Sequence, residues 1–520
     1  MSEFDVCESL NRALFLAKRV TKGVLQLNPS QQNAVNILLN VLNLKNDVPL
    51  GGIQGPPGTG KTTVIEGFVH QLASKDIREM DGLLIYVAPT NYLVMQAFER
   101  VAATLIAKGF TLSDVVEMVK LFGYKINAET PCSKLPEWRE IGSVPSDMAV
   151  RGIVGGKIDP SKVKLIFTTE YQRVSSEFAK KPKEIFLVVD EASRSPFYRP
   201  FISLADEIMR YKDYPYALVG LGDPEQAITI SKGLKIEKVP LLMEKIKNIL
   251  SEYKLDKNYI MLDTTYRLPS PSEKPISHGF YEDKLLAFEA AESRLKALEE
   301  IVEDLETQAK NRIEQVFSFG SLKGVFDKIS EAVTTHTPIV LVPTSEFNPE
   351  KDVSTLDIGR IKLGLKAAIV LGAFISVAKE AGSYQVPTMM VTAPYSDMVL
   401  NTSFQWKMIR SKASSKIERP RFATVQSVIG GEADIVITML GKEYVKTKQG
   451  YYTNKNYYYW GNEYSTIYFN EPQVLNVQLS RHRELLIVVG NVDKLASSSF
   501  NEKVSNTAAV LNQLAAKVYQ

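Results

Sequence analysis

The sequence predicts an α/β protein built from two tandem parallel-sheet domains. Short runs rich in β-branched residues alternate with helical patterns, which is typical of α/β units. These runs fall into two groups, and a length of 520 residues suits two domains of roughly 200 residues that carry insertions. With 45% apolar and 23% charged residues, the composition excludes a disordered chain, a collagen-like fibre and a low-complexity scaffold.

The first domain is expected at residues 1–230. Its strands are short apolar runs bounded by turn residues or a polar segment, as expected of strands buried on both faces. These runs are residues 83–87, 164–168, 185–189 and 216–220. Residues 231–262 begin with a stretch rich in Lys and Glu at helical spacing, and we interpret them as a connector.

The second domain is expected at residues 263–497, followed by a C-terminal helix at 498–520. Its strands are expected at residues 338–342, 388–392, 422–425, 434–439 and 485–489. The most apolar run, residues 367–378, is shorter than the roughly 20 residues that a membrane-spanning helix needs. It therefore predicts a buried helix.

Three segments do not fit the alternating pattern and are interpreted as insertions. Residues 101–162 separate two strands by more than one crossover helix needs, and residues 442–470 are rich in Tyr and Asn. Residues 285–319 predict a long charged helix with an apolar stripe at Leu295, Leu298, Val302, Leu305, Ala309 and Val316. This spacing fits a coiled-coil-like seam and a helix packed along the domain core equally well.

A glycine-rich motif provides the strongest functional signal. It consists of Gly55, Pro56, Pro57, Gly58, Thr59, Gly60, Lys61 and Thr62, with Thr63 directly after it. An apolar segment precedes the motif and an amphipathic one follows, which is the strand–loop–helix context of a phosphate-binding loop. Backbone N–H groups at the helix N-terminus favour phosphate, Lys61 would contact the β- and γ-phosphates, and Thr62 would bind Mg²⁺.

Two carboxylates complete this predicted site. The apolar run 185–189 ends in Asp190 and Glu191. Asp190 would hold the Mg²⁺ shell, and Glu191 would orient or deprotonate the attacking water. Hydrolysis of ATP or GTP is therefore the function that the residues predict by themselves.

Further motifs follow in a fixed order along the chain. Gln226 follows the next predicted strand, where its amide would sense the γ-phosphate. After it come residues 263–267, 425–434 and 476–483, which include Arg267, Glu432 and Arg481. Taken together, this series resembles the ordered motifs of superfamily 1 helicases, specifically the 5′-to-3′ branch typified by the up-frameshift helicase of nonsense-mediated decay.

The resemblance implies two tandem RecA-like domains with ATP in the cleft between them. Gln31 resembles the residue that bonds the adenine edge, and Tyr266 resembles the aromatic residue that stacks on adenine. Arg267 and Arg481 resemble the two arginines that the second domain extends towards the γ-phosphate as arginine fingers. Glu432 matches the acid that approaches the nucleotide from the second domain.

The resemblance also places nucleic-acid contacts on the opposite rim of both sheets. The implied residues are small or hydroxyl-bearing groups suited to phosphate and sugar, namely Pro89, Thr90, Asn91, Thr168, Thr169, Pro394, Tyr395, Thr424 and Ser427. Three positions depart from the family pattern: Ile429 replaces the usual Gln, Ala393 a common Thr and His482 the usual Ala. Ile429 cannot form a side-chain hydrogen bond, so we expect altered coupling between nucleic-acid binding and the ATP site at this position.

These observations predict an ATP- and Mg²⁺-dependent helicase that travels 5′-to-3′ on one strand of DNA or RNA. Two alternatives stay open: a single-strand translocase or remodelling ATPase that does not unwind, and a nucleotide-gated scaffold. The intact Asp190–Glu191 pair argues against the scaffold, because a pure binder does not need the water-orienting acid. We expect a cytoplasmic monomer that binds no membrane, with the helix at 285–319 as a possible surface for a protein partner.

Overall fold

The computed structural model describes the greater part of the chain. The described residues are 5–20, 26–42, 49–74, 77–80, 82–122, 132, 145, 147–204, 216–227, 240–344, 357–413, 416–428, 431–441, 459–460, 463–464, 467–497 and 501–518. They form two compact units. The first comprises Met1–Pro56, Gly60–Ala227 and Ser231–Leu262, and the second comprises Pro57–Thr59, Ile228–Ile230 and Asp263–Gln520.

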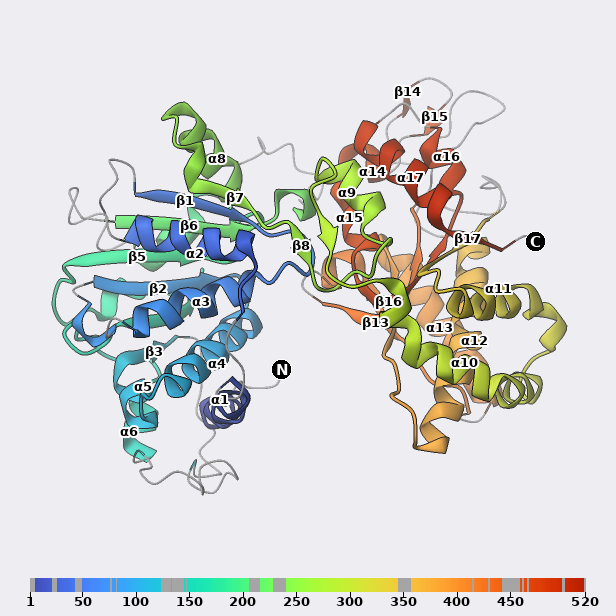
Figure 1. The fold of residues 1–520 in the computed structure, drawn as a ribbon, viewed down its shortest axis with the longest axis horizontal. Coiled ribbons are helices and arrows are strands. Elements are labelled where there is room, and N and C mark those ends of the chain that lie inside the picture. The colour runs from blue at the N-terminus through green and yellow to red at the C-terminus, as the bar shows by residue number, and fades with distance from the viewer. Residues whose placement is uncertain are drawn as a thin grey trace. The chain divides into compact units, whose positions relative to one another are not determined.

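A seven-stranded sheet forms the centre of the first unit (Figure 1). In sheet order its strands are β3 (Val119–Leu121), β4 (Leu165–Thr169), β2 (Gly82–Ala88), β5 (Glu184–Val189), β6 (Tyr216–Gly222), β1 (Leu50–Gln54) and β7 (Tyr259–Met261). Every neighbouring pair is parallel, so the carboxyl ends of all strands meet at one edge. Loops at this edge carry the candidate site.

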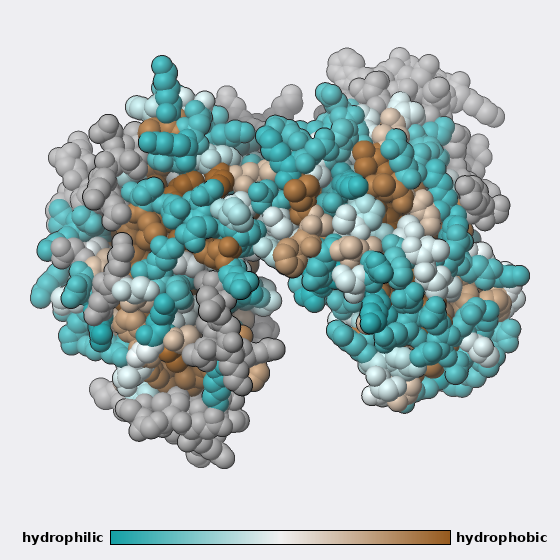
Figure 2. Space-filling model, viewed as in Figure 1, coloured by the Kyte–Doolittle hydropathy of each residue, from teal (hydrophilic) through white to brown (hydrophobic). Residues whose placement is uncertain are grey.

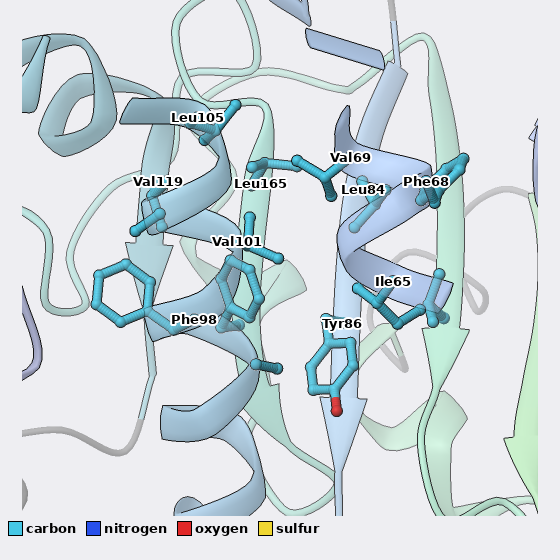
Figure 3. Packing of buried hydrophobic residues seen from close by; sticks show 14 of the residues in the cluster. Ile65, Phe68, Val69, Leu84, Tyr86, Phe98, Val101, Leu105, Val119 and Leu165 are labelled. Carbon is cyan, nitrogen blue, oxygen red and sulfur yellow. The ribbon is translucent and has the colours of Figure 1, made fainter. Parts of the chain in front are cut away.

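Helices cover both faces of this sheet. Those of the first unit are α1 (Val6–Val20), α2 (Pro29–Leu42), α3 (Lys61–Ala73), α4 (Asn91–Ala107), α5 (Leu112–Met118), α6 (Asp147–Gly152) and α8 (Leu242–Glu252). Alternate residues of β2 face opposite cores, because side chains alternate along a strand. Leu84 and Tyr86 pack against α3 and α4, as Figure 3 shows, whereas Ile85 packs in the core that includes α8.

A six-stranded parallel sheet forms the centre of the second unit. Its order is β12 (Arg421–Thr424), β11 (Met389–Ala393), β13 (Ala433–Met439), β16 (His482–Val489), β10 (Ile339–Val342) and β17 (Ala516–Lys517). The long helices of this unit are α10 (Ala291–Glu314), α11 (Lys323–Thr334), α12 (Ile358–Ala381), α13 (Ser396–Ala413) and α17 (Glu502–Leu514). Its shorter helices are α9 (Lys274–Phe280), α14 (Ile467–Asn470), α15 (Gln473–Leu479) and α16 (Val492–Ala496).

The two sheets share one strand order. In the first, β1 lies between β6 and β7, and β2 lies between β4 and β5. In the second, β10 lies between β16 and β17, and β11 lies between β12 and β13. β3 at the edge of the first sheet is the extra strand. The predicted pair of tandem parallel sheets is therefore confirmed, and all nine predicted strands lie on or overlap observed strands.

Two predicted domain boundaries are wrong. Residues 231–262 are not a connector, because their described part contains α8, which packs on the first sheet, and β7, which pairs with β1. Residues 498–520 contain the predicted C-terminal helix as α17, but they are not separate from the second domain. α17 packs against α9 and α16, and β17 pairs with β10, so this segment belongs to the second unit.

The helix at 285–319 is part of the second unit's core. On α10, Leu295, Leu298 and Ala309 are no more than 1% exposed and pack in one cluster with α11, α12 and the sheet. The interpretation as an insertion is therefore wrong, and the partner of the apolar stripe is its own unit. The outward surface of α10 is mainly hydrophilic in Figure 2.

The insertion predicted at 101–162 is also too long. α4 continues to Ala107, α5 begins at Leu112, and β3 pairs with β4 as the edge strand of the first sheet. Of 123–146, only Cys132 and Pro145 lie within the described residues. Cys132 forms a disulfide with Cys7 of α1, with the two Cα atoms 5.1 Å apart.

The Tyr-rich segment 442–470 lies mostly outside the described residues. Its described part contains β14 (Tyr459–Trp460) and β15 (Glu463–Tyr464), which pair antiparallel, and then α14. Tyr468 of α14 is fully buried, and its hydroxyl donates to Gln478 Oε1 at 2.6 Å. This tyrosine is therefore structural.

The apolar run 367–378 lies within α12, a helix of 24 residues. By length and composition α12 is apolar enough to span a membrane. However, 83% of its most apolar 18-residue segment is buried inside the protein. It is the central helix of the second unit's core cluster. The predicted buried helix is confirmed, although it is twice as long as the apolar run.

Candidate nucleotide and strand-binding sites

The glycine loop joins β1 to α3 and needs glycine at two positions. Gly58 and Gly60 have φ angles of 70° and 80°, in the left-handed region that favours glycine. A Cβ on Gly60 would lie 2.7 Å from Gln31 Nε2, so the loop also needs glycine for space. α3 begins at Lys61, which places Thr62 and Thr63 in its first turn, where backbone N–H groups have no partner within the helix.

Lys61 and Glu191 lie together at this loop. Lys61 Nζ donates to Gly55 O at 3.0 Å and is 3.7 Å from Glu191 Oε1. The two side chains come from the start of α3 and the end of β5, which are 130 positions apart in the sequence. The structure thus brings the predicted phosphate-binding lysine and the predicted water-orienting acid into one site.

Asp190 is held in a polar setting at the end of β5. Tyr86 OH donates to Asp190 Oδ2 at 2.5 Å, and Glu191 N donates to Asp190 Oδ1 at 2.9 Å. Figure 3 shows the Tyr86 hydroxyl directed towards the carboxyl end of β2. Burial and the neighbouring charge of Glu191 raise the pKa of Asp190, while Lys61 acts in the opposite direction.

Glu191 has a backbone conformation that costs energy. Its φ angle is 52°, which a non-glycine residue adopts at a cost on the order of 1–3 kcal/mol. The next residue is fixed by a bond from Ala192 N to Leu221 O at 2.8 Å. The neighbouring strand thus sets the turn that directs the Glu191 carboxylate towards Lys61.

Gln226 belongs to a buried polar network centred on Asp223. Gln226 Nε2 donates to Asp223 Oδ2 at 2.6 Å, and Gln54 Nε2 donates to Asp223 Oδ1 at 3.2 Å. Tyr259 OH donates to Gln54 Oε1 at 3.2 Å, and burial raises the pKa of this tyrosine. The sequence pointed to Gln226 but not to Asp223, three positions before it, and the partners Gln54 and Tyr259 come from β1 and β7 and meet only in the folded sheet.

Gln31 lies at the start of α2 beside the glycine loop. It is 2% exposed, and its Oε1 accepts from Asn28 N at 3.1 Å while Asn28 Oδ1 accepts from Gln31 N at 2.8 Å. These two bonds fix the side chain with its amide nitrogen near Gly60. Its predicted contact with the base edge remains a prediction.

The tip of the glycine loop packs within the second unit. Thr265 Oγ1 donates to Pro57 O at 2.7 Å, and Tyr266 N donates to Gly58 O at 2.9 Å. The Tyr266 ring packs against Phe288, with centroids 4.8 Å apart and the planes tilted by 40°. Phe288 is 63% exposed and was missed, because the sequence around it has no motif.

Arg267 and Glu432 are brought together in the second unit. Arg267 Nε donates to Glu432 Oε2 at 2.7 Å, and Arg267 Nη1 donates to Ser480 O at 3.1 Å. Arg483 Nε donates to Glu432 Oε1 at 3.0 Å. Burial would raise the pKa of Glu432, but the two guanidinium groups outweigh it and hold that pKa below its usual range. Arg483 was missed, although it stands two positions after Arg481.

Arg481 has a different environment from Arg267. Its side chain is 1% exposed, with Nε donating to Val477 O at 3.1 Å and Nη1 donating to Gly431 O at 3.4 Å. In this structure it is therefore bonded to backbone carbonyls of its own unit. Its role as an arginine finger remains a prediction.

His482 is fully buried beside Arg481. Its Nε2 is 2.8 Å from Ser272 Oγ, and burial is the main cause that lowers its pKa to about 3. The ring is therefore neutral at physiological pH and has a structural contact within the second unit. Ile429, another of the three departures from the family pattern, lies outside the described residues.

The predicted strand contacts of the first unit lie at the carboxyl ends of β2 and β4. Pro89, Thr90 and Asn91 follow β2, and Thr90 Oγ1 caps α4 by accepting from Leu93 N at 3.4 Å. Thr168 and Thr169 end β4 and are both buried. Since β2 and β4 are neighbours, the two loops lie side by side. They leave the same edge of the parallel sheet as the glycine loop after β1, so the expected position on the opposite rim is wrong for the first unit.

The predicted strand contacts of the second unit lie at the corresponding strand ends. Pro394 and Tyr395 follow β11, while Thr424 ends the neighbouring β12. Thr424 Oγ1 accepts from Ser427 N at 3.3 Å, and Ser427 Oγ donates to Thr424 O at 2.9 Å. Ala393, where the family commonly has Thr, is the last residue of β11 and is fully buried.

The residues at the glycine loop fit Mg²⁺ with a nucleotide. Thr62 offers a hydroxyl in the first turn of α3, and Asp190 offers a carboxylate at the end of β5. Within the described part of the chain, no group of three or more His, Cys, Asp or Glu residues could hold a metal ion by itself. Mg²⁺ does not require such a group, because in nucleotide sites it binds one or two protein ligands, substrate phosphates and water.

Comparison with known proteins gives two domain matches. Families described as AAA domain match residues 26–127 and residues 242–493. DNA polymerase alpha-associated DNA helicase A of Saccharomyces cerevisiae is 23% identical over 513 residues, covering 90% of this chain and 65% of that protein. Regulator of nonsense transcripts 1 homolog of Arabidopsis thaliana is 38% identical over 82 residues, covering 16% of this chain and 6% of that protein.

These alignments set the extent of the likeness. The chain spans 65% of the length of the yeast relative, and the plant relative matches over a short segment. Among solved structures, arterivirus nonstructural protein 10, a helicase in complex with DNA, aligns over 91% of this chain and 65% of that chain with 12% identity and a TM-score of 0.35. A TM-score this low does not define the fold, which is established by the strand order of the two sheets.

Proposed function

The chain belongs to the AAA-domain family, and we propose that it is an ATP-dependent nucleic-acid helicase. It is homologous to superfamily 1 helicases of the DNA helicase A and nonsense-transcript-regulator type. The observation that carries the proposal is the meeting of Lys61, Glu191 and Asp190 at the glycine loop. A protein that only bound nucleotide would need the loop and lysine, but not the water-orienting acid.

In the proposed reaction the first unit binds ATP and prepares the water. Backbone N–H groups of residues 58–62 bind the phosphates, and Lys61 Nζ exchanges its bond to Gly55 O for phosphate oxygens. Glu191 accepts a proton from the attacking water. Thr62 and Asp190 would hold Mg²⁺, which neutralises phosphate charge when it is bound.

We assign the charge-stabilising role to residues of the second unit. Arg267 and Arg481 would neutralise charge that develops on the transferred phosphoryl group, and Tyr266 would stack on the adenine. Glu432 keeps Arg267 in a fixed orientation through the bond at 2.7 Å. The support for these roles is the position of the residues in the ordered motifs, together with the shared Arg267–Glu432 contact.

We further propose that the loops after β2, β4, β11 and β12 hold a single strand of DNA or RNA. ATP binding and hydrolysis would change the grip of the two units in turn, which moves the protein 5′-to-3′. Action as a monomer and a cytoplasmic location are part of the same proposal. In a reducing cytoplasm the Cys7–Cys132 pair would be present as thiols.

ATPase activity with and without matched single-stranded RNA and DNA tests this function, followed by unwinding of duplexes with 5′ or 3′ tails. We expect stimulation by single strands and unwinding of the 5′-tailed duplex. Stimulation without unwinding would replace the helicase with a translocase. No turnover in either condition would contradict the proposal and leave the nucleotide-gated scaffold.

A further inference from the structure

Exposed aromatic side chains lie in the loops of the first unit that follow β4 and β5 and, after β2, in the first turn of α4. Tyr92 is 54% exposed, Tyr171 62%, Phe197 39% and Tyr198 49%. None of them belongs to the motifs considered above. Because all strands of the sheet are parallel, these loops leave the same edge as the predicted strand contacts.

Tyr171 combines exposure with nearby positive charge. It follows β4 by two residues, and Arg199 Cζ lies 5.6 Å from the centroid of its ring. Arg199 Nη1 is also 3.5 Å from the Tyr171 hydroxyl oxygen, and the charge of Arg194 acts on the same hydroxyl. An exposed ring beside two guanidinium groups offers one surface to a base and two partners to phosphate.

The position of Arg199 is fixed by a buried carboxylate. Arg199 Nη1 donates to Glu170 Oε1 at 3.1 Å, and Ser195 Oγ donates to Glu170 Oε2 at 2.5 Å. Glu170 and Ser195 are 2% and 3% exposed, whereas Tyr171 is largely in solvent. A buried pair of this kind holds the guanidinium in place before any ligand arrives, which lowers the entropy lost on binding.

We propose that Tyr171 and Arg199 form a base-stacking subsite for single-stranded nucleic acid, and that Glu170 and Ser195 link its occupancy to the hydrolytic Glu191. The inference rests on the proposed function and adds residues that it does not include. A base stacks on the exposed part of the Tyr171 ring, and a neighbouring phosphate binds Arg199 and Arg194. Stacking and charge neutralisation do not depend on base identity, so the subsite takes any sequence.

The link to Glu191 runs through one short segment. Glu191, Arg194, Ser195 and Arg199 all lie within nine positions, and Arg194 N donates to Glu191 O at 2.9 Å. Glu191 has the left-handed φ of 52°, so the turn that carries the catalytic acid is strained. A strand that draws Arg199 towards its phosphate changes the bonds of Glu170 and Ser195, and Ser195 is four residues from Glu191. Glu170 and Ser195 are therefore positioning residues.

A nucleic acid suits this surface better than a protein does. The exposed rings stand beside cations, and the nearest carboxylate, Glu170, is buried and already bonded to Arg199 and Ser195. The site is also next to Thr168 and Thr169, and Glu170 N donates to Ala88 O at 3.2 Å, directly before Pro89. The subsite thus continues the predicted path of the strand.

Crosslinking tests the contact in the unmodified protein. Single-stranded RNA and DNA of one sequence, with 5-bromouracil in place of uracil or thymine, are bound, irradiated and digested with trypsin. Cleavage after Lys164 and Arg173 releases peptide 165–173, which contains Tyr171. We expect this peptide among the crosslinked products. Its absence, when other peptides of the first unit are crosslinked, would overturn the subsite.

Substitution measures the contribution of the ring. Tyr171→Ala should weaken single-strand binding about tenfold, within the range found for loss of one stacked base, whereas Tyr171→Phe should bind as the wild type does. Tyr253 is 60% exposed on the C-terminal side of α8 and provides a matched control. Tyr253→Ala should bind normally. Equal affinities of Tyr171→Ala and the wild type would refute the subsite.

The ratio of strand-stimulated to basal ATPase tests the link. Ser195→Ala removes the donor to Glu170 and should lower this ratio several-fold while strand affinity stays within twofold, and Ser195→Thr should restore it. A purely structural role would lower both rates equally, together with the melting temperature, and would refute the link. If the wild type itself neither binds single strands nor is stimulated by them, the proposed function fails; if it does both and the variants match it, the subsite alone fails.

Discussion

The two units have the same strand order but different residues at equivalent strand ends. In the first unit β5 is followed by Asp190 and Glu191, whereas in the second unit the equivalent β13 is followed by Leu440, which is fully buried, and Gly441. β1 leads into the glycine loop and α3, whereas β10 is followed by Pro343. Both parallel sheets present their strand ends at one edge. The residues of the loop that follows a strand determine whether that position is a functional site.

The charged residues proposed to act on phosphate or water are arginines in the second unit, and two acids and a lysine in the first. Arg267 and Arg483 share Glu432, and Arg481 is bonded to backbone carbonyls. Carboxylates and an amine suit water activation and phosphate binding, while guanidinium groups suit stabilisation of developing charge. The proposed function therefore predicts that the first unit activates the water and that arginines of the second stabilise the developing charge.

Substitution of the second unit's arginines should give the largest effect on rate. Arg481→Ala should lower kcat by about 10³-fold or more while ATP affinity changes little, because an arginine finger acts in the transition state. Arg419→Ala is the control, since Arg419 is an exposed arginine of the second unit with no proposed role in the reaction. Steady-state ATPase and nucleotide binding measure both. If Arg481→Ala keeps more than a tenth of the wild-type kcat, Arg481 is structural.

Substitution of Lys61 tests the first unit's part. Lys61→Ala should reduce hydrolysis to background and also weaken ATP binding, because the phosphates lose their charged partner. Lys120, a lysine of the same unit on β3, provides a control in Lys120→Ala, which should hydrolyse ATP normally. ATP binding and turnover that are normal in Lys61→Ala would remove the glycine loop from the reaction.

The core position of α10 predicts an effect on stability. Leu298→Ala should lower the free energy of unfolding by about 2–5 kcal/mol, since it deletes a large side chain that is 1% exposed in the second unit's core. Lys296→Ala, on the exposed face of the same helix, should change it by less than about 0.5 kcal/mol. Thermal and denaturant unfolding measure both. Equal stability of the two variants would contradict the core position of α10 and favour the original interpretation as an insertion.

His482 predicts a smaller, pH-dependent effect. Its pKa is about 3 in the folded protein and near 6.5 when exposed, so below pH 6.5 the unfolded chain binds a proton that the folded chain does not. Stability therefore falls as the pH drops below 6.5. Between pH 8 and pH 5.5 the loss is about 1.4 kcal/mol from this group.

Glu484 acts with the opposite sign, so a difference measurement is needed. Burial, aided by Asp434, raises the pKa of Glu484 to about 7, and the folded chain therefore takes up a proton as the pH falls through 7. Comparing His482→Asn with the wild type cancels this contribution. The variant should gain about 1.4 kcal/mol relative to the wild type on going from pH 8 to pH 5.5. Parallel pH profiles would show that His482 is not buried in its neutral form.

The residues that could be predicted from sequence are those in short contiguous patterns. The glycine loop, the Asp190–Glu191 pair and the apolar runs each lie within a few positions, so spacing and periodicity identify them. β7 and β17 were missed because they have only three and two residues, fewer than the runs from which the strands were predicted. α10 was misassigned because its apolar stripe fits two kinds of partner, and only the folded unit decides between them.

The missed site residues have a common cause. Asp223 receives a hydrogen bond from Gln54, which is 169 positions away, and Arg483 binds Glu432, which is 51 positions away. Tyr171 and Arg199 follow different strands, β4 and β5, and the bond from Arg199 to Glu170 brings them together. Contacts of this kind follow from strand order, which a single sequence does not state.

The most direct test of the division between the units is a single-turnover measurement on Glu191→Gln with a labelled single strand. The substitution keeps the glycine loop, Lys61 and the Asp190 carboxylate but removes the group that accepts the proton from water. We predict ATP affinity within a few-fold of the wild type, a hydrolysis rate about 10²–10⁴-fold lower, and a strand that stays bound while ATP is present. A variant that hydrolyses ATP at the wild-type rate, or that loses ATP affinity as fully as Lys61→Ala does, would contradict the assignment of hydrolysis to the first unit's acid.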